Sequence, residues 1–152
     1  MSSTDAQARQ ELLDDLAQAA DDLGHALASL GGAYELLDEP QGDRLEEELF
    51  RPVQRAYGRA RRAYGEFAGR HGLGEHEFTM PSPGVPSTGV KGFVEDAVEA
   101  VERAEHHLVQ LQESPMAIEL GDVEFRAGLS ETRRLIDGVP RHAHAFVSTF
   151  GR

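Results

Sequence analysis

The chain has 152 residues, with 27 acidic and 15 basic side chains, a net charge of −12 and no cysteine. The length predicts a single domain spanning residues 1–152, and the lack of cysteine excludes disulfides, thiolate nucleophiles and cysteine-bound metals. The negative charge argues against nucleic acids and anionic membranes as partners.

The first predicted helix covers about residues 4–38. Apolar side chains recur there every three or four positions, which is typical of a helix packed in a bundle: Leu13, Leu16, Ala20, Leu23, Leu27, Leu30, Tyr34 and Leu37. Alanine and glycine flank this stripe on both sides, so we expect neighbouring helices to approach closely. Gly31 and Gly32 are the weak point, since each glycine costs about 1 kcal/mol relative to alanine in a helix.

The second predicted helix covers about residues 43–72. Asp43 and Glu46 form a capping-box pattern that predicts its start, and Gly72 is a usual residue just past a helix C-terminus. Pro52 lies inside the apolar pattern. We expect it to kink or divide the helix, because proline lacks an N–H and its ring clashes with the preceding turn.

Residues 73–89 form a connection rich in proline and glycine, a composition that disfavours helix and strand. Fully extended, this segment would reach about 50 Å, enough to run the length of a helical bundle. The preferred interpretation is an up-and-down order of the helices. The alternative sends the connection along the side of the bundle, which makes the second and third helices parallel.

The third and fourth predicted helices cover about residues 90–114 and 122–150. Asp122 is a good N-cap for the fourth helix, and Pro140 is expected to kink it near Gly138. Together the patterns predict an all-α fold, a four-helix up-and-down bundle with a long Pro/Gly-rich connection between helices 2 and 3.

Charge is distributed unevenly among the predicted helices. Helix 1 (4–38) has eight acidic and one basic side chain, helix 2 (43–72) five and seven, helix 3 (88–114) six and two, and helix 4 (122–152) four and five. In a square bundle with the helices in sequential order, every adjacent pair is acidic against basic. We therefore expect helices 1 and 3 to lie on a diagonal, because placing them side by side brings like charges together.

Metal and catalytic motifs are missing from the sequence. No Glu-x-x-His occurs in the four predicted helices, so the usual ligand set of a carboxylate-bridged dimetal site is lacking. There is no Gly-x-Ser-x-Gly, no His-Glu-x-x-His and no Gly-rich phosphate loop. We expect no catalytic residue, no metal site and no cofactor.

Three tyrosines are candidates for a ligand pocket: Tyr34, Tyr57 and Tyr64. They interleave with small residues on helices 1 and 2, and their rings and hydroxyls could line a pocket for a small apolar ligand beside the Pro52 kink. Buried tyrosines of this kind are more often part of a core, with the hydroxyl satisfied at its edge.

Helix 2 carries a basic row that is a candidate for binding an anion or an acidic partner: Arg51, Arg55, Arg59 and Arg62. The alternative for this row is pairing with the aspartates of helix 1.

The function predicted from these features is that of a non-catalytic helical module for protein interaction or self-association, with a second copy or another protein as partner. The alternative is a helical bundle that binds a small ligand or a metal. No stretch approaches the roughly 20 apolar residues of a membrane span, and Met1 to Asp5 lack a secretory pattern. We therefore expect a soluble, cytoplasmic protein.

Overall fold

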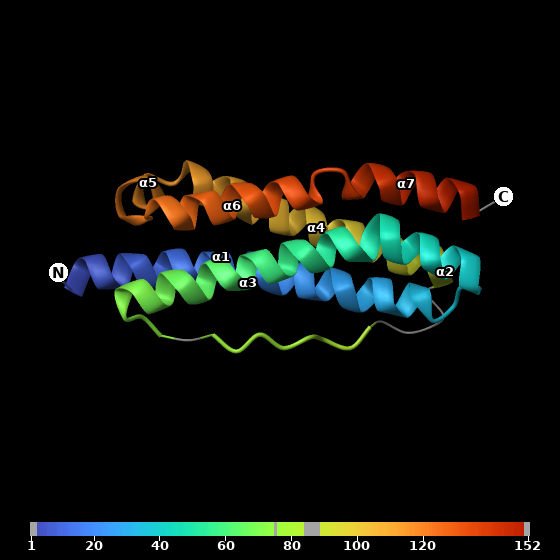
Figure 1. Cartoon of the computed structure of the whole chain (residues 1–152), viewed down its shortest axis with the longest axis horizontal. Helices are drawn as coiled ribbons and strands as arrows, with labels where there is room; N and C mark the ends of the chain where they lie inside the picture. Colours follow the sequence, from blue (N-terminus) through green and yellow to red (C-terminus); the bar gives the residue numbers. More distant parts are fainter. Residues whose placement is uncertain (1–2, 75, 84–88, 151–152) are drawn as a thin grey trace.

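The computed structural model describes residues 3–74, 76–83 and 89–150, and every regular element within these ranges is helical. The all-α prediction is confirmed. The elements are α1 (Ser3–Tyr34), α2 (Glu39–Leu45), the π-helical turn η1 (Glu46–Phe50), α3 (Arg51–His71), α4 (Gly89–Glu113), α5 (Pro115–Leu120), α6 (Val123–Ile136) and α7 (Val139–Phe150). The long helices run along the long axis of the molecule (Figure 1).

The turn between the first two helices lies earlier in the chain than predicted. Helix α1 ends at Tyr34 and α2 begins at Glu39, so the predicted boundaries at 38 and 43 are wrong. The N-cap is Asp38, whose Oδ1 accepts a hydrogen bond from the Gln41 N–H at 3.0 Å. Pro40 then sits in the first turn, where its missing N–H is not needed.

Pro52 neither ends nor divides the second helix. Backbone angles stay right-handed helical from α2 through η1 into α3, so residues 39–71 form one continuous rod. The widened turn η1 stands directly before Pro52, with the Arg51 N–H bonded to the Glu46 carbonyl five residues back. The π-helical geometry of η1 accommodates Pro52, because the proline ring would otherwise clash with a regular α-helical turn at this place. The rod ends at Gly72, as predicted, in a left-handed conformation with φ of 63°.

The predicted fourth helix is divided by the structure into α6 and α7. Asp122 caps α6 as predicted, with its Oδ1 accepting from the Phe125 N–H at 2.8 Å. Helix α6 ends at Ile136, and α7 begins at Val139 with Pro140 as its second residue. Pro140 therefore produces a break at Gly138 rather than a kink within one helix.

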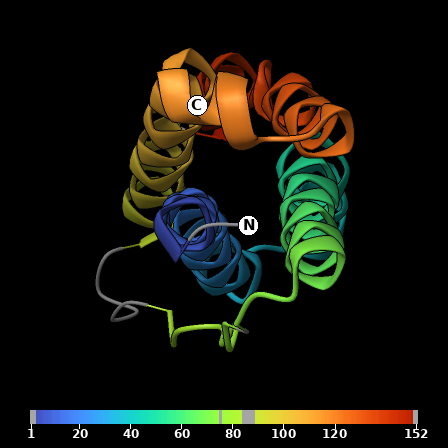
Figure 2. The same ribbon diagram turned by 90° about the vertical axis from the view of Figure 1, so that its left-hand side faces the viewer.

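Four helical rods surround the core: α1, the rod from α2 to α3, α4, and the pair α6 and α7. Viewed end-on, they occupy the corners of a square (Figure 2). Helix α1 contacts α3 and α4, and the pair α6 and α7 contacts the same two helices from the other side. The most extensive contact between two helices is that of α1 with α4.

Helices α3 and α4 run in the same direction, because both are antiparallel to α1. Tyr57 of α3 packs on Gly24 in the middle of α1, and the N–H of Gly74, just past α3, donates to Gln10 Oε1 near the start of α1. On the other side, Phe93 at the start of α4 lies on Gly32 at the end of α1. The preferred up-and-down order is therefore not the one observed, and the helix directions match the alternative.

The connection between these two parallel helices is extended wherever the structure describes it. Residues 76–83 have no helix or strand and run along the outside of the helices, as Figure 1 shows. Within the predicted connection, residues 75 and 84–88 lie outside the described residues, and Gly89 already belongs to α4.

The prediction that the acidic helices lie on a diagonal is wrong. Helices α1 and α4 each carry six acidic side chains against one and two basic ones, and they are direct neighbours. Both helices carry small buried side chains, which allow helix backbones to approach closely: Ala19, Ala26, Ala33, Ala97, Ala100 and Ala104. The burial of this long interface outweighs surface charge pairs, each of which is worth only about 0–1 kcal/mol.

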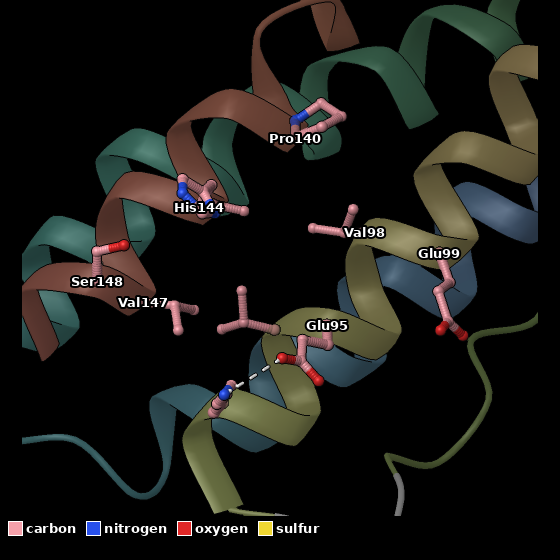
Figure 3. Close-up of a pocket in the computed structure, with 10 residues that line it drawn as sticks. Glu95, Val98, Glu99, Pro140, His144, Val147 and Ser148 are labelled. Atoms are coloured by element: carbon pink, nitrogen blue, oxygen red, sulfur yellow. Dashed lines mark ion pairs between the residues drawn. The ribbon is translucent and has the colours of Figure 1, made fainter. Parts of the chain in front are cut away.

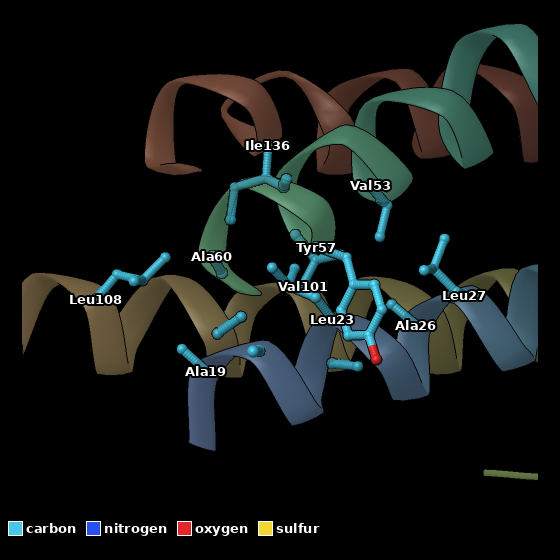
Figure 4. Packing of buried hydrophobic residues seen from close by; sticks show 14 of the residues in the cluster. Ala19, Leu23, Ala26, Leu27, Val53, Tyr57, Ala60, Val101, Leu108 and Ile136 are labelled. Carbon is cyan, nitrogen blue, oxygen red and sulfur yellow. The ribbon is translucent and has the colours of Figure 1, made fainter. Parts of the chain in front are cut away.

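The core lies along the axis between the four rods and receives side chains from all of them. Figure 4 shows Leu23 of α1, Tyr57 of α3, Val101 of α4 and Ile136 of α6 converging from different sides. Leu23 and Ile136 are fully buried. The interior is thus filled by hydrocarbon side chains along its length.

The adjacent glycines near the end of α1 provide a test of the α1–α4 contact. A Cβ at Gly32 would lie 2.8 Å from the ring of Phe93, which is 3% exposed, whereas a Cβ at Gly31 would meet nothing within 4 Å. We expect Gly32→Ala to lower the free energy of unfolding by about 1–3 kcal/mol through overpacking. Gly31→Ala should raise it by about 0.5–1 kcal/mol. Urea denaturation measures both, and equal effects of the two substitutions would contradict this packing.

Asp122 joins the end of α3 to the start of α6. Its two oxygens accept hydrogen bonds from Arg70 Nε and Nη2, both at 2.7 Å, in addition to the cap on α6. Burial tends to raise the pKa of Asp122, but the hydrogen bonds from Arg70 and from the Phe125 N–H lower it to about 2. The ionised carboxylate is therefore favoured in the folded state.

We expect Asp122→Ala to lower the free energy of unfolding by about 1–3 kcal/mol at neutral pH, through loss of the cap and the ion pair. A lowered pKa contributes stability above the ordinary aspartate value, and this contribution is lost as the pH falls toward 2. The difference in the free energy of unfolding between Asp122→Ala and wild type, measured by urea titration, should therefore become smaller as the pH is lowered. Asp137→Ala is the matched control, since Asp137 lies at the C-terminal end of α6, where a negative charge is unfavourable.

Candidate functional site

A groove with a volume of about 700 Å³ lies between α4 and α7. Figure 3 shows its walls, with Val98 of α4 on one side of the opening and Val147 of α7 on the other. The lining residues are Lys91, Val94, Glu95, Val98, Glu99, Pro140, Ala143, His144, Val147 and Ser148. The groove is partly open to solvent, since half of its lining residues are exposed.

The floor of this groove is apolar. Val94 and Ala143 are buried, at 1% and 2% exposure, whereas Val98, Pro140 and Val147 are only half-buried. The break at Gly138 gives α7 its own start next to α4, and Pro140 occupies its first turn. Apolar surface from two helices distant in the sequence thus remains accessible to a further partner.

The rim of the groove is polar. Glu95 and Glu99 are exposed on the α4 side, and His144 and Ser148 are exposed on the α7 side. Lys91 forms an ion pair with Glu95, with Nζ and Oε1 at 3.9 Å. An apolar floor with a charged rim is the usual composition of a groove that binds an amphipathic helix.

A second cluster of polar side chains bridges the two acidic helices and the extended segment 76–83. Three histidine–aspartate pairs form it: His25 with Asp96 (Nε2 to Oδ2, 2.9 Å), His107 with Asp22 (Nε2 to Oδ2, 3.5 Å) and His76 with Asp21 (Nε2 to Oδ2, 3.1 Å). Ser29 also donates a hydrogen bond to Asp96. Two of these pairs, His25 with Asp96 and His107 with Asp22, join α1 directly to α4, and the third joins α1 to the extended segment.

Asp22 is the most unusual member of this cluster, because its side chain is buried (8% exposed) and its Oδ2 accepts no hydrogen bond. Burial raises its pKa, and the charges of His107 and Arg103 offset this only in part. Asp22, His25 and His76 line a polar pocket of about 440 Å³ beneath residues 79 and 81. Within the described ranges, no group of three or more His, Asp or Glu side chains could hold a metal ion.

The three candidate tyrosines lie in separate places. Tyr57 is buried with its ring against Gly24, and Tyr64 is buried with its hydroxyl donating to the Gly74 carbonyl at 3.3 Å. Tyr34 is 45% exposed at the end of α1, against Gly42. The structure does not bring the three rings together. A ligand pocket shared by the three tyrosines therefore stays a prediction.

The arginine row of α3 faces solvent and α6 rather than α1. Arg59 is half-buried, and its Nε donates to Glu131 Oε2 of α6 at 2.9 Å. Arg51, Arg55 and Arg62 are exposed. Docking of an anion or an acidic partner on these exposed arginines stays a prediction, whereas Arg59 is already paired within the fold.

No protein-family model, no curated protein and no solved structure matches this chain. In the described ranges, none of the helices combines the length and the apolar character that crossing a membrane requires. The site must therefore be interpreted from its own geometry.

Asp22 gives a pH-dependent prediction. A carboxyl group whose pKa is raised on folding makes the folded state less stable as the pH rises through that pKa. Asp22→Asn removes the ionisation at nearly constant shape, so it should raise the melting temperature relative to wild type at neutral pH. The gain should shrink below the ordinary aspartate pKa, where the wild-type carboxyl is protonated. Asp14→Asn, at an exposed position of the same helix, is the control, and a pH-independent effect of Asp22→Asn would contradict the assignment.

Proposed function

We propose that this chain is a non-catalytic protein-interaction module and that the groove between α4 and α7 is its docking site. The observation that carries the proposal is the apolar floor of a groove of about 700 Å³, left open between two helices. A folded protein normally covers such surface, and apolar surface with a polar rim is typical of interaction sites. The partner is another protein or a second copy of the chain.

The packing of the helices supports this proposal, because it holds the two walls of the groove in fixed positions. We propose that the fold is a four-helix bundle in which the Pro/Gly-rich connection, residues 73–89, allows α3 and α4 to be parallel. In such a bundle, α4 and α7 are held by the core through Val101, Ala104 and Phe146, so the groove is preformed. A cytoplasmic location, as expected from the sequence, belongs to the same proposal.

The docking function is tested by placing a charge on the floor of the groove. Val98→Arg should fold, because Val98 is only half-buried and a long arginine can extend toward solvent. We expect it to weaken association by at least about tenfold, or about 1.4 kcal/mol. The matched control is Val123→Arg, because Val123 is a valine at the start of α6, 67% exposed and outside the groove.

Two measurements provide the comparison. Light scattering after size-exclusion chromatography reports self-association over a range of concentrations. Capture from extracts of the source cells, followed by calorimetry with the purified binding protein, reports a partner. Association that is retained by Val123→Arg and lost by Val98→Arg would support the proposal. Identical behaviour of wild type and both variants in every measurement would refute it.

A further inference from the structure

The two rims of the α4–α7 groove differ in charge. On the α4 side, Glu95 and Glu99 lie four residues apart, so they form one row along the helix. Both are exposed, and among the described ion pairs only Glu95 has a partner, Lys91 at 3.9 Å. The α7 rim, with His144 and Ser148, carries no carboxylate.

The shape of the groove fits one additional helix. Its walls are two antiparallel helices, and its floor is formed by Val94 and Val98 on one side and Ala143 and Val147 on the other. On each wall the two apolar residues are four positions apart, about one helical turn, so they form an apolar strip along the floor. A helix with apolar side chains at matching intervals can insert them along this strip.

We infer that the groove binds an amphipathic helix of another protein, with apolar side chains on the buried face and lysine or arginine along the edge next to α4. This inference rests on the proposed docking function and adds the chemistry and orientation of the partner. Glu95 and Glu99 attract the basic edge and disfavour the reversed orientation, which would place the basic side chains along the α7 rim, where no lining carboxylate lies.

A folded second copy of the chain does not meet this requirement. Helix α3 carries the exposed arginines Arg51, Arg55 and Arg62, but its apolar side chains, including Val53 and Ala60, are fully buried in the core. No other described helix has more than three basic side chains. A net charge of −12 on each copy also opposes association of two acidic surfaces.

The test uses two synthetic helical peptides that share a leucine face and differ along one edge, which carries lysine in one and glutamate in the other. Fluorescence anisotropy measures the binding of each labelled peptide to the full chain. Wild type should bind the lysine peptide at least about tenfold more tightly than the glutamate peptide. Glu95→Lys combined with Glu99→Lys should abolish or reverse this preference.

The control for net charge is Glu11→Lys combined with Asp14→Lys. These two exposed residues of α1 lie outside the groove, and their reversal changes the total charge by the same amount. The control should retain the preference for the lysine peptide. If it loses the preference as completely as the groove variant does, the attraction is a property of the whole molecule and the inference is refuted.

Val98→Arg separates the failure of this inference from that of the docking function. Binding that depends on Val98 but shows no preference between the peptides would refute the basic partner and leave the docking function standing. Peptide binding unaffected by Val98→Arg would refute both. Light scattering that shows a dimer of the wild type and a monomer of Val98→Arg would refute the inference in favour of a second copy as the occupant.

Discussion

The close packing of α1 against α4 is the constraint on which the rest of the structure depends. Both helices carry buried alanines, and the Phe93 ring of α4 lies directly against Gly32 of α1. Once α4 is antiparallel to α1 on one flank and α3 is antiparallel to α1 on the other, α3 and α4 must be parallel. The chain then has to travel the length of the molecule between them, which explains why so long an extended connection exists (Figure 1).

The contact between α1 and α4 also places the acidic helices on one side of the molecule and the basic helix α3 on the other. Acidic helices α1 and α4 share one side, while α3, with six basic side chains, shares the other with α6. Residual repulsion between α1 and α4 is reduced by bridges such as His25 to Asp96 and Arg103 to Asp22. The exposed carboxylate of Glu99 on α4 is left without such a bridge among the described ion pairs, and it borders the groove.

Periodicity was sufficient to predict the helices but not their order. Repeating apolar residues identify the buried face of each helix, and Asp122 and Gly72 act as the boundary residues that their chemistry predicts. The choice of neighbours depends on how closely two backbones can approach, a property of the paired surfaces. Alternation of charge favours a different order of the helices. Burial of apolar side chains along a whole helix, however, contributes far more free energy than surface ion pairs do.

The groove between α4 and α7 could not be predicted from the sequence for the same reason. Val98 is recognisable in the sequence as a residue that widens the apolar stripe of its helix, but Val147 becomes its partner only when α7 is placed beside α4. The histidine–aspartate pairs likewise join residues far apart in the sequence, as with His25 and Asp96. The groove exists because α4 and α7 are neighbours in the bundle. Which helices become neighbours depends on how closely alanine and glycine let their backbones approach, and not on any chemically reactive residue.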